Sequence, residues 1–297
     1  MKEIKTGKVV LGIVGTLMIL VIAQIAAQLI ASLLVAIHVP AFICNIIAGI
    51  LYVVFAYLLL KIYAKKVLSL QLSELGIPKF KVKMKWLLTA FVLPLVVTGI
   101  YFLMPGDLQK GNMDLAETVT AISAGIFFTG IGAGIVEEMV FRGFIMNLLD
   151  AKMGRKAGIL IPSLFFGALH IIGMNFSILS CLQVLIAGTF VGIMFSLIAL
   201  ERHSVWNGAV VHAMWNIIIL GGFLSIGETP DEYSAFSYIL KTRSFAITGG
   251  EFGIESSIIA IVGYVIVTLI AYTCIRKNGF AFCGKRVSIG TTIEKEV

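Results

Sequence analysis

The chain alternates between long apolar segments and short polar stretches. A helix needs about 20 mainly apolar residues to cross the hydrocarbon core of a bilayer. The segments that approach or exceed this length are 9–36, 41–60, 87–104, 118–149, 157–172, 178–199, 204–223 and 256–275. The pattern therefore predicts about eight transmembrane helices. The fourth is long enough to tilt or to project from the membrane, and the fifth is short.

The composition supports this interpretation. Of the 297 residues, 59% are hydrophobic and 13% are charged, and the mean hydropathy is +1.02. An ordinary soluble domain carries about 25% charged residues. We therefore expect an all-α polytopic protein of the cell membrane, in which residues 1–297 form a single integral membrane domain without internal repeats.

The distribution of the charges indicates a topology. The net charge is +7, and in an eight-span arrangement 19 of the 23 Lys and Arg residues lie on the same side as both termini. By the positive-inside rule, both termini are cytoplasmic. We expect no nucleic-acid partner, because such a partner requires basic charge gathered on one folded surface. The longest loop, 224–255, lies on the opposite side, and we expect it to form a solvated cap without a chemical role.

A small set of polar residues interrupts the predicted spans, where ionised side chains are costly. These residues are Glu137, Glu138 and Arg142 in the fourth span, His170 in the fifth, and His212 and Asn216 in the seventh. Glu138 and Arg142 are four residues apart, so they share a helix face and can form an ion pair. Glu137 is rotated from Glu138 by about 100° and can face a cavity or a neighbouring helix.

The polar residues of the three spans lie at similar depths. At about 1.5 Å per residue, Glu137 lies about 20 Å from the cytoplasmic end of its span, and His170 lies about 20 Å from the start of its own. His212 and Asn216 lie about 12 and about 18 Å into the seventh span. The sequence therefore predicts one site, formed by helices four, five and seven.

The residue types of this site suit hydrolysis by an activated water molecule. A carboxylate and an imidazole can together deprotonate water, and a second imidazole and an amide can donate hydrogen bonds to an oxyanion. One Glu with two His is also a zinc ligand set, so Glu137, His170 and His212 are candidates for holding a divalent metal. The compact His-Glu-x-x-His spacing of soluble zinc proteases is missing. No serine or cysteine accompanies the set in a nucleophile motif, which argues against a covalent mechanism.

Three motifs in this region resemble those of a known family. EEMVFR (137–142) fits Glu-Glu-x-x-x-Arg, FGALH (166–170) fits Phe-x-x-x-His, and HAMWN (212–216) fits His-x-x-x-Asn. In these motifs and their order, the chain resembles the CPBP intramembrane proteases. That family includes the type II CAAX prenyl endopeptidases and bacteriocin-immunity proteins. The resemblance extends over about residues 120–223, a third of the chain.

The resemblance implies an intramembrane endopeptidase acting on a membrane-associated protein or peptide, prenylated or not. Glu137 and His170 would activate the water, His212 and Asn216 would stabilise the oxyanion, and the ion pair of the first motif would maintain the geometry of the site. The family is often called a metalloprotease family, yet the same residues support a metal-free mechanism, so the need for zinc stays open. The alternative is a non-catalytic bacteriocin-immunity protein, or a peptide-binding or transport protein that uses the same polar cavity.

Overall fold

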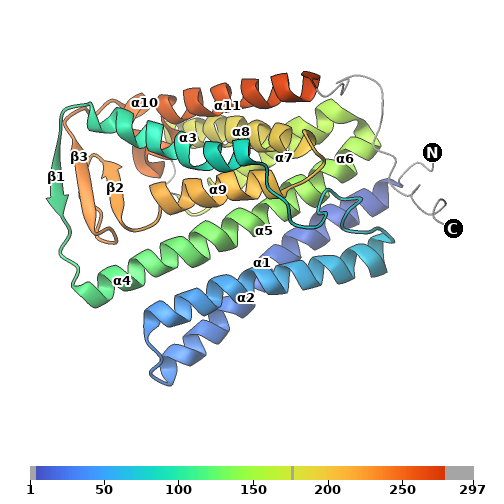
Figure 1. Cartoon of the computed structure of the whole chain (residues 1–297), viewed down its shortest axis with the longest axis horizontal. Coiled ribbons are helices and arrows are strands. Elements are labelled where there is room, and N and C mark those ends of the chain that lie inside the picture. Colours follow the sequence, from blue (N-terminus) through green and yellow to red (C-terminus); the bar gives the residue numbers. More distant parts are fainter. Residues whose placement is uncertain (1–4, 175–176, 278–297) are drawn as a thin grey trace.

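A computed structural model describes residues 5–174 and 177–277 (Figure 1). Its helices are α1 (Thr6–Ala36), α2 (Ala41–Tyr63), α3 (Met84–Phe102), α4 (Leu115–Ser123), α5 (Gly134–Glu138), α6 (Met146–Met153), α7 (Arg155–Leu169), α8 (Ile178–Leu200), α9 (Trp206–Ile219), α10 (Phe245–Thr248) and α11 (Ile258–Lys277). The long helices run side by side along the length of the molecule, with α1 and α2 as a pair at one edge.

The all-α polytopic architecture is confirmed, but the number of long spans differs from the prediction. Each of the eight predicted apolar segments forms a helix. Within the described residues, however, six helices are long and apolar enough to cross a membrane. The exceptions are α7, with 15 residues, and α9, with 14. Helices of this length extend about 21 to 23 Å, less than the roughly 30 Å of the hydrocarbon core.

The short helix α9 is enclosed by other helices. Most of its residues are buried, and it lies between α3 and α5 (Figure 1). A helix that is buried all round contacts protein instead of lipid, so its polar side chains and its ends can be satisfied inside the bundle. The helix that carries His212 and Asn216 can therefore be short and polar without exposing either residue to hydrocarbon.

The fourth predicted span is a single helix of 39 residues, Leu115–Met153, which includes α4, α5 and α6. A capping box at Asp114 and Glu117 begins it. The helix is π-helical between its α-helical parts, over Ala124–Ala133 and Met139–Ile145. π-Helical turns are rare and often occur at functional sites. Here they flank the short α-helical part, α5, that carries both glutamates.

The backbones of α5 and α9 touch at Gly134. A Cβ atom added to this glycine would lie 2.7 Å from the backbone nitrogen of Ala213 and 2.8 Å from its Cα. Only glycine allows so close an approach. The contact fixes the separation of the two helices close to the site. On α5 it lies one turn from the glutamates, and on α9 it lies next to His212.

A small sheet at one end of the bundle was not predicted. Its strands are β1 (Gly106–Lys110), β2 (Leu224–Gly227) and β3 (Phe236–Leu240), in the order β1-β3-β2. Strand β1 is antiparallel to β3, and β2 is parallel to it. The segment 224–255 is therefore more than a solvated loop, since it contributes two strands and the helix α10 to this end of the molecule.

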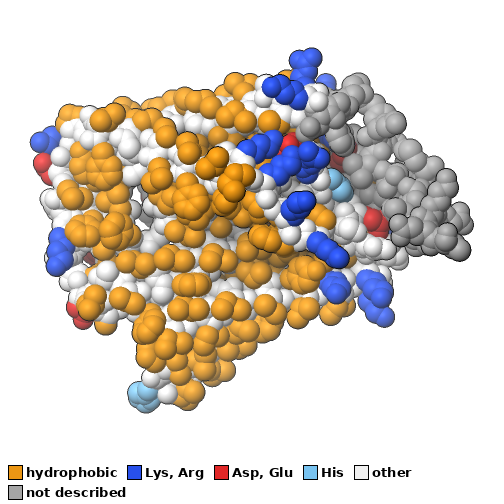
Figure 2. Space-filling view, in the orientation of Figure 1, with side chains coloured by type: hydrophobic (Ala, Val, Ile, Leu, Met, Phe, Trp, Pro, Cys, Tyr) orange, Lys and Arg blue, Asp and Glu red, His pale blue; other side chains and the backbone are white. Residues whose placement is uncertain are grey.

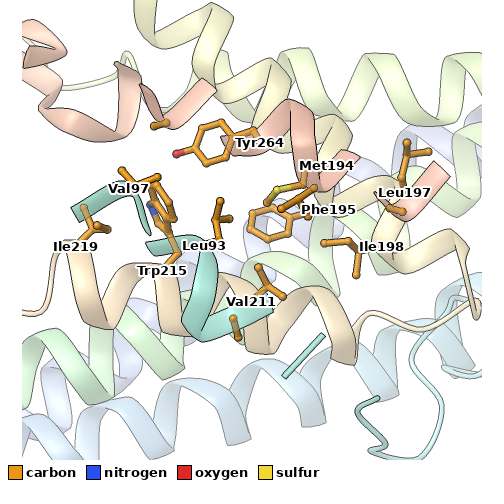
Figure 3. Close-up of a cluster of buried hydrophobic side chains, with 14 of the residues drawn as sticks. Leu93, Val97, Met194, Phe195, Leu197, Ile198, Val211, Trp215, Ile219 and Tyr264 are labelled. Carbon is orange, nitrogen blue, oxygen red and sulfur yellow. The ribbon is translucent and has the colours of Figure 1, made fainter. Parts of the chain in front are cut away.

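The surface has the character of a membrane protein. Large apolar side chains such as Leu58, Leu88 and Leu164 are exposed along the flanks of the bundle, and Figure 2 shows such side chains covering most of the visible flank. The Lys and Arg side chains visible in this view lie mainly at the end where α6 and α11 finish. Inside, a core cluster of α3, α8, α9 and α11 includes Phe195, Trp215 and Tyr264 (Figure 3).

At the basic end, Glu201 links the end of α8 to the start of α3. Its carboxylate accepts hydrogen bonds from Lys83 Nζ at 2.9 Å, Lys85 Nζ at 2.7 Å and Trp86 Nε1 at 2.6 Å. Burial of Glu201 acts to raise its pKa, but the hydrogen bonds from the two lysines and the tryptophan outweigh burial and lower the pKa from 4.5 to about 2. The charged form of Glu201 is therefore favoured in the folded protein.

We expect Glu201→Gln to lower the midpoint of thermal unfolding in detergent at neutral pH. Because the pKa of Glu201 is lower in the folded protein, its charge stabilises the fold above pH 4.5, and this contribution is lost as the pH falls toward about 2. The difference from wild type should shrink over that interval. Glu232→Gln, at an exposed position, is the control. A difference that does not depend on pH would contradict the prediction.

Candidate active site

The four predicted catalytic residues line one cavity of about 290 Å³. Glu137 comes from α5, His170 from the end of α7, and His212 and Asn216 from α9. Much of the remaining lining is apolar and comes partly from α8 and α11, and Glu255 lies in the same wall. The structure therefore brings together residues that the sequence predicted to meet from the fourth, fifth and seventh apolar segments.

The predicted ion pair between Glu138 and Arg142 is present and buried. Arg142 Nη1 lies 2.8 Å from Glu138 Oε1, and the two side chains are 1% and 0% exposed. The guanidinium also donates to the carbonyl of Gly192 at 3.3 Å. It lies over the rings of Phe166 and Phe195, at 4.6 and 5.2 Å from the ring centres. Pairing, a carbonyl and two aromatic faces together stabilise a cation that would be costly in lipid.

His212 connects this ion pair to the cavity. Its Nδ1 atom lies 3.2 Å from Glu138 Oε1, and its Nε2 atom lies 3.8 Å from Glu137 Oε2. Because an ionised carboxylate only accepts hydrogen bonds, Nδ1 carries a proton and Nε2 faces Glu137. The imidazole stacks on Phe195, with ring centres 4.8 Å apart and planes at 17°. Gly208 leaves room for Glu138, since a Cβ there would lie 3.0 Å from Glu138 Oε2.

His170 does not lie inside a helix, which corrects the prediction. Helix α7 ends at Leu169, and His170 follows it. Its Nδ1 atom lies 2.8 Å from the carbonyl oxygen of Phe166, in the last turn of the helix. A carbonyl accepts only, so Nδ1 carries the proton, and Nε2 has a free lone pair when the ring is neutral. The ring is held between Phe166 and Phe252, at 4.5 and 5.9 Å between ring centres.

Asn216 is anchored to the long helix. Its Nδ2 atom donates to the carbonyl of Thr129 at 3.0 Å. This hydrogen bond joins α9 to the π-helical segment Ala124–Ala133 and fixes the plane of the amide. One N–H of the amide is used in this way, and an amide nitrogen carries two.

Glu137, His170 and His212, the candidate ligands for a divalent metal, all line the cavity. Within residues 5–174 and 177–277, no group of three or more His, Cys, Asp or Glu side chains is placed to hold a metal ion. The Nδ1 atom of His212 is hydrogen-bonded to Glu138, and the Nδ1 atom of His170 is hydrogen-bonded to the carbonyl of Phe166. The histidines of the cavity are thus arranged by hydrogen bonds from Nδ1, which leaves their Nε2 atoms as the reactive positions.

Glu255 was assigned to the solvated outer loop by the sequence, but it lines the cavity. Its Oε2 atom accepts a hydrogen bond from Trp215 Nε1 at 3.0 Å. Burial raises the pKa of Glu255, and the hydrogen bond from Trp215 acts in the opposite direction. No motif identifies this residue. The one available signal was an acidic residue directly before the apolar segment 256–275, and that position is common at membrane surfaces.

The fold and the site define a class of protein. A bundle with an apolar flank that encloses carboxylate and imidazole groups is suited to hydrolysis inside a membrane. Residues 118–218 match the family model of Rce1-like type II CAAX prenyl endopeptidases. The match covers about a third of the chain and includes all seven defined positions of the three motifs, and it supports a CAAX-type intramembrane protease of the CPBP family. No curated protein and no solved structure matches the chain.

We expect Arg142→Leu to destabilise the protein by about 3–5 kcal/mol, because it leaves the Glu138 carboxylate buried without its cation. Among the residues that the structure describes, Glu138 Oε2 has no hydrogen-bond partner. The double variant Glu138→Gln/Arg142→Leu should recover part of this loss, since it removes the unpaired charge. Denaturant unfolding in detergent measures both. If the double variant is as unstable as Arg142→Leu alone, the unpaired carboxylate is not the cause.

Proposed function

We propose that this protein is an intramembrane endopeptidase that cleaves a peptide bond of a membrane-associated protein or peptide by means of a water molecule activated by Glu137 and His170. The main support is that both residues line the same cavity as two hydrogen-bond donors suited to an oxyanion, His212 and Asn216. None of the described residues that line the cavity is Ser or Cys. Water is the nucleophile of this proposal, because Glu137 and His170 are of the residue types that activate it.

Glu137 is the base of this mechanism. Its side chain is 23% exposed, whereas that of Glu138 is fully buried and paired. A water molecule in the cavity can give its proton to Glu137, while the lone pair on His170 Nε2 accepts its second hydrogen bond. The water oxygen then forms a bond to the carbonyl carbon. When the C–N bond breaks, the proton held by Glu137 passes to the leaving nitrogen.

His212 and Asn216 stabilise the oxyanion of the tetrahedral intermediate. Glu138 orients His212 through Nδ1, so that Nε2, when protonated, can donate to the oxyanion. Asn216 supplies the N–H that Thr129 does not use. Both groups are held in place before a substrate arrives, which is the condition for strong electrostatic stabilisation.

The environment of the site favours a membrane-associated substrate. The flanks of the bundle are apolar (Figure 2), so the protein that holds the cavity is embedded in a bilayer, beside membrane-associated substrates. We place the protein in the cell membrane with its basic end, and thus both termini, in the cytoplasm.

Replacement of Glu137 by Gln should abolish cleavage, with a loss of about 10²- to 10⁴-fold in rate, because the amide cannot accept the proton of water. The measurement compares new protein termini across the proteome in cells that carry wild type or Glu137→Gln at matched expression. Specific termini should disappear in the variant and persist in the exposed control Glu232→Gln. Identical profiles, with the cellular role retained, would show that the protein acts by binding, as an immunity or transport protein does.

Removal of metal provides a separate test. Since the described donors form no three-ligand set, we expect the purified protein to cleave at an unchanged rate after dialysis against a strong chelator. His170→Ala should still lower the rate, because His170 positions the water. If chelation abolishes cleavage and zinc restores it, the metal-free mechanism is wrong, and Glu137, His170 and His212 become the ligands to test.

A further inference from the structure

The segment 245–256, which carries Glu255, is hydrogen-bonded to helices of the bundle. Gln183 of α8 donates hydrogen bonds to the carbonyls of Phe245 at 3.1 Å and of Ser256 at 3.0 Å, near the two ends of the segment. Tyr101 of α3 donates to the carbonyl of Ile247 at 2.6 Å. These contacts bring a part of the chain that follows the sheet back into the protein, where it forms one wall of the cavity.

The Glu255 carboxylate itself has a fixed orientation. Trp215 Nε1 holds one oxygen, Oε2, at 3.0 Å, and the hydroxyl of Tyr264 donates to the backbone carbonyl of Glu255 at 3.0 Å. Trp215 and Tyr264 pack edge to face, with ring centres 5.1 Å apart, and Figure 3 shows both within the core cluster. The carboxylate is thus anchored through one oxygen while the residue lines the cavity.

The lining of the cavity holds two carboxylates, Glu137 and Glu255, and two imidazoles, His170 and His212. Among the described lining residues, Glu137 and Glu255 are acidic and none is Lys or Arg. The nearby Arg142 is directed to Glu138 and Gly192. The mechanism uses Glu137 and leaves Glu255 without a role. A hydrogen bond to Trp215 needs only a neutral acceptor, such as the amide oxygen of Gln, so this contact alone does not require a carboxyl group at position 255. An ammonium or guanidinium group in the cavity would offset the cost of a carboxylate in apolar surroundings.

We propose that Glu255 forms a binding subsite for a cationic group of the substrate, an ammonium or a guanidinium, close to the bond that is cleaved. The proposal rests on the proposed endopeptidase function. Lys or Arg side chains, or a free α-amino group, would supply this chemistry. The preferred substrates would then combine an apolar, membrane-associated segment with a positive charge near the cleavage site.

The first test measures cleavage of a peptide library by the purified protein in lipid vesicles. The library varies one position at a time and contains Lys or Arg beside the neutral analogues norleucine and citrulline, with free and acetylated N-termini. Mass spectrometry of the products gives the preference at each position. Wild type should prefer the cationic members by about 10- to 100-fold, the range expected for a hydrogen bond to a charged group. Loss of the preference on acetylation would identify the α-amino group as its source.

Glu255→Gln should remove this preference while cleavage of the neutral peptides continues, because Gln still accepts the hydrogen bond of Trp215. Trp215→Phe is the matched control, since it removes the hydrogen bond and keeps the charge, and its cationic preference should persist. An unchanged preference in Glu255→Gln, or no preference in wild type, would overturn the proposal.

A binding measurement separates this proposal from the proposed function. In Glu137→Gln, which cannot activate water, a fluorescent Lys peptide should bind about 10-fold or more tightly than its norleucine analogue. The additional change Glu255→Gln should remove the difference. If binding shows the preference but wild type cleaves no peptide, the cation subsite stands and the endopeptidase function fails. If cleavage occurs without any cation preference in binding, the reverse holds.

Discussion

The site depends on one buried carboxylate, that of Glu138, which accepts hydrogen bonds from both a guanidinium and an imidazole. Glu138 Oε1 accepts from Arg142 at 2.8 Å and from His212 at 3.2 Å, in an environment with essentially no exposure to solvent. The ion pair makes an arginine tolerable among aromatic rings, and the second contact sets the direction of the imidazole. A defect in either partner therefore affects both the cohesion of the helices and the chemistry of the cavity. The glycines at 134 and 208 serve the same arrangement, because they let α9 approach the helix that carries the two glutamates.

The short helix α7 ends where it does for a physical reason. A transmembrane helix normally ends in the polar region of the bilayer, but α7 ends at the histidine that lines the cavity. The end of a helix leaves unpaired carbonyl groups, and at this end the His170 ring satisfies the Phe166 carbonyl. The hydrogen bond that satisfies a carbonyl at the end of α7 therefore also orients the His170 ring. This arrangement is tolerable only where protein shields the helix end from lipid.

The sequence predicted the polytopic all-α class, the ion pair and the meeting of Glu137 with His170, His212 and Asn216, since apolar length and helical spacing carry that information directly. The end of α7 at Leu169 was not predicted, because the apolar run continues through Ile171 and Ile172 without a breaker. The sheet was missed because its strands have four or five residues, and because β1 lies more than 100 positions before β3, the strand with which it pairs. Glu255 was missed for a related reason: its approach to the cavity depends on how a loop folds back, which is a tertiary effect without local periodicity.

The small sheet has a mechanical consequence for the site. Strand β1 leads into the helix of Glu137, β2 continues from the helix of His212, and β3 leads to the segment of Glu255. Three separate walls of the cavity are therefore hydrogen-bonded to each other at a point outside it. A force or a bound molecule that shifts one strand would be transmitted to the spacing of all three walls at once. The sheet therefore links, outside the cavity, the chain segments that lead to Glu137, His212 and Glu255.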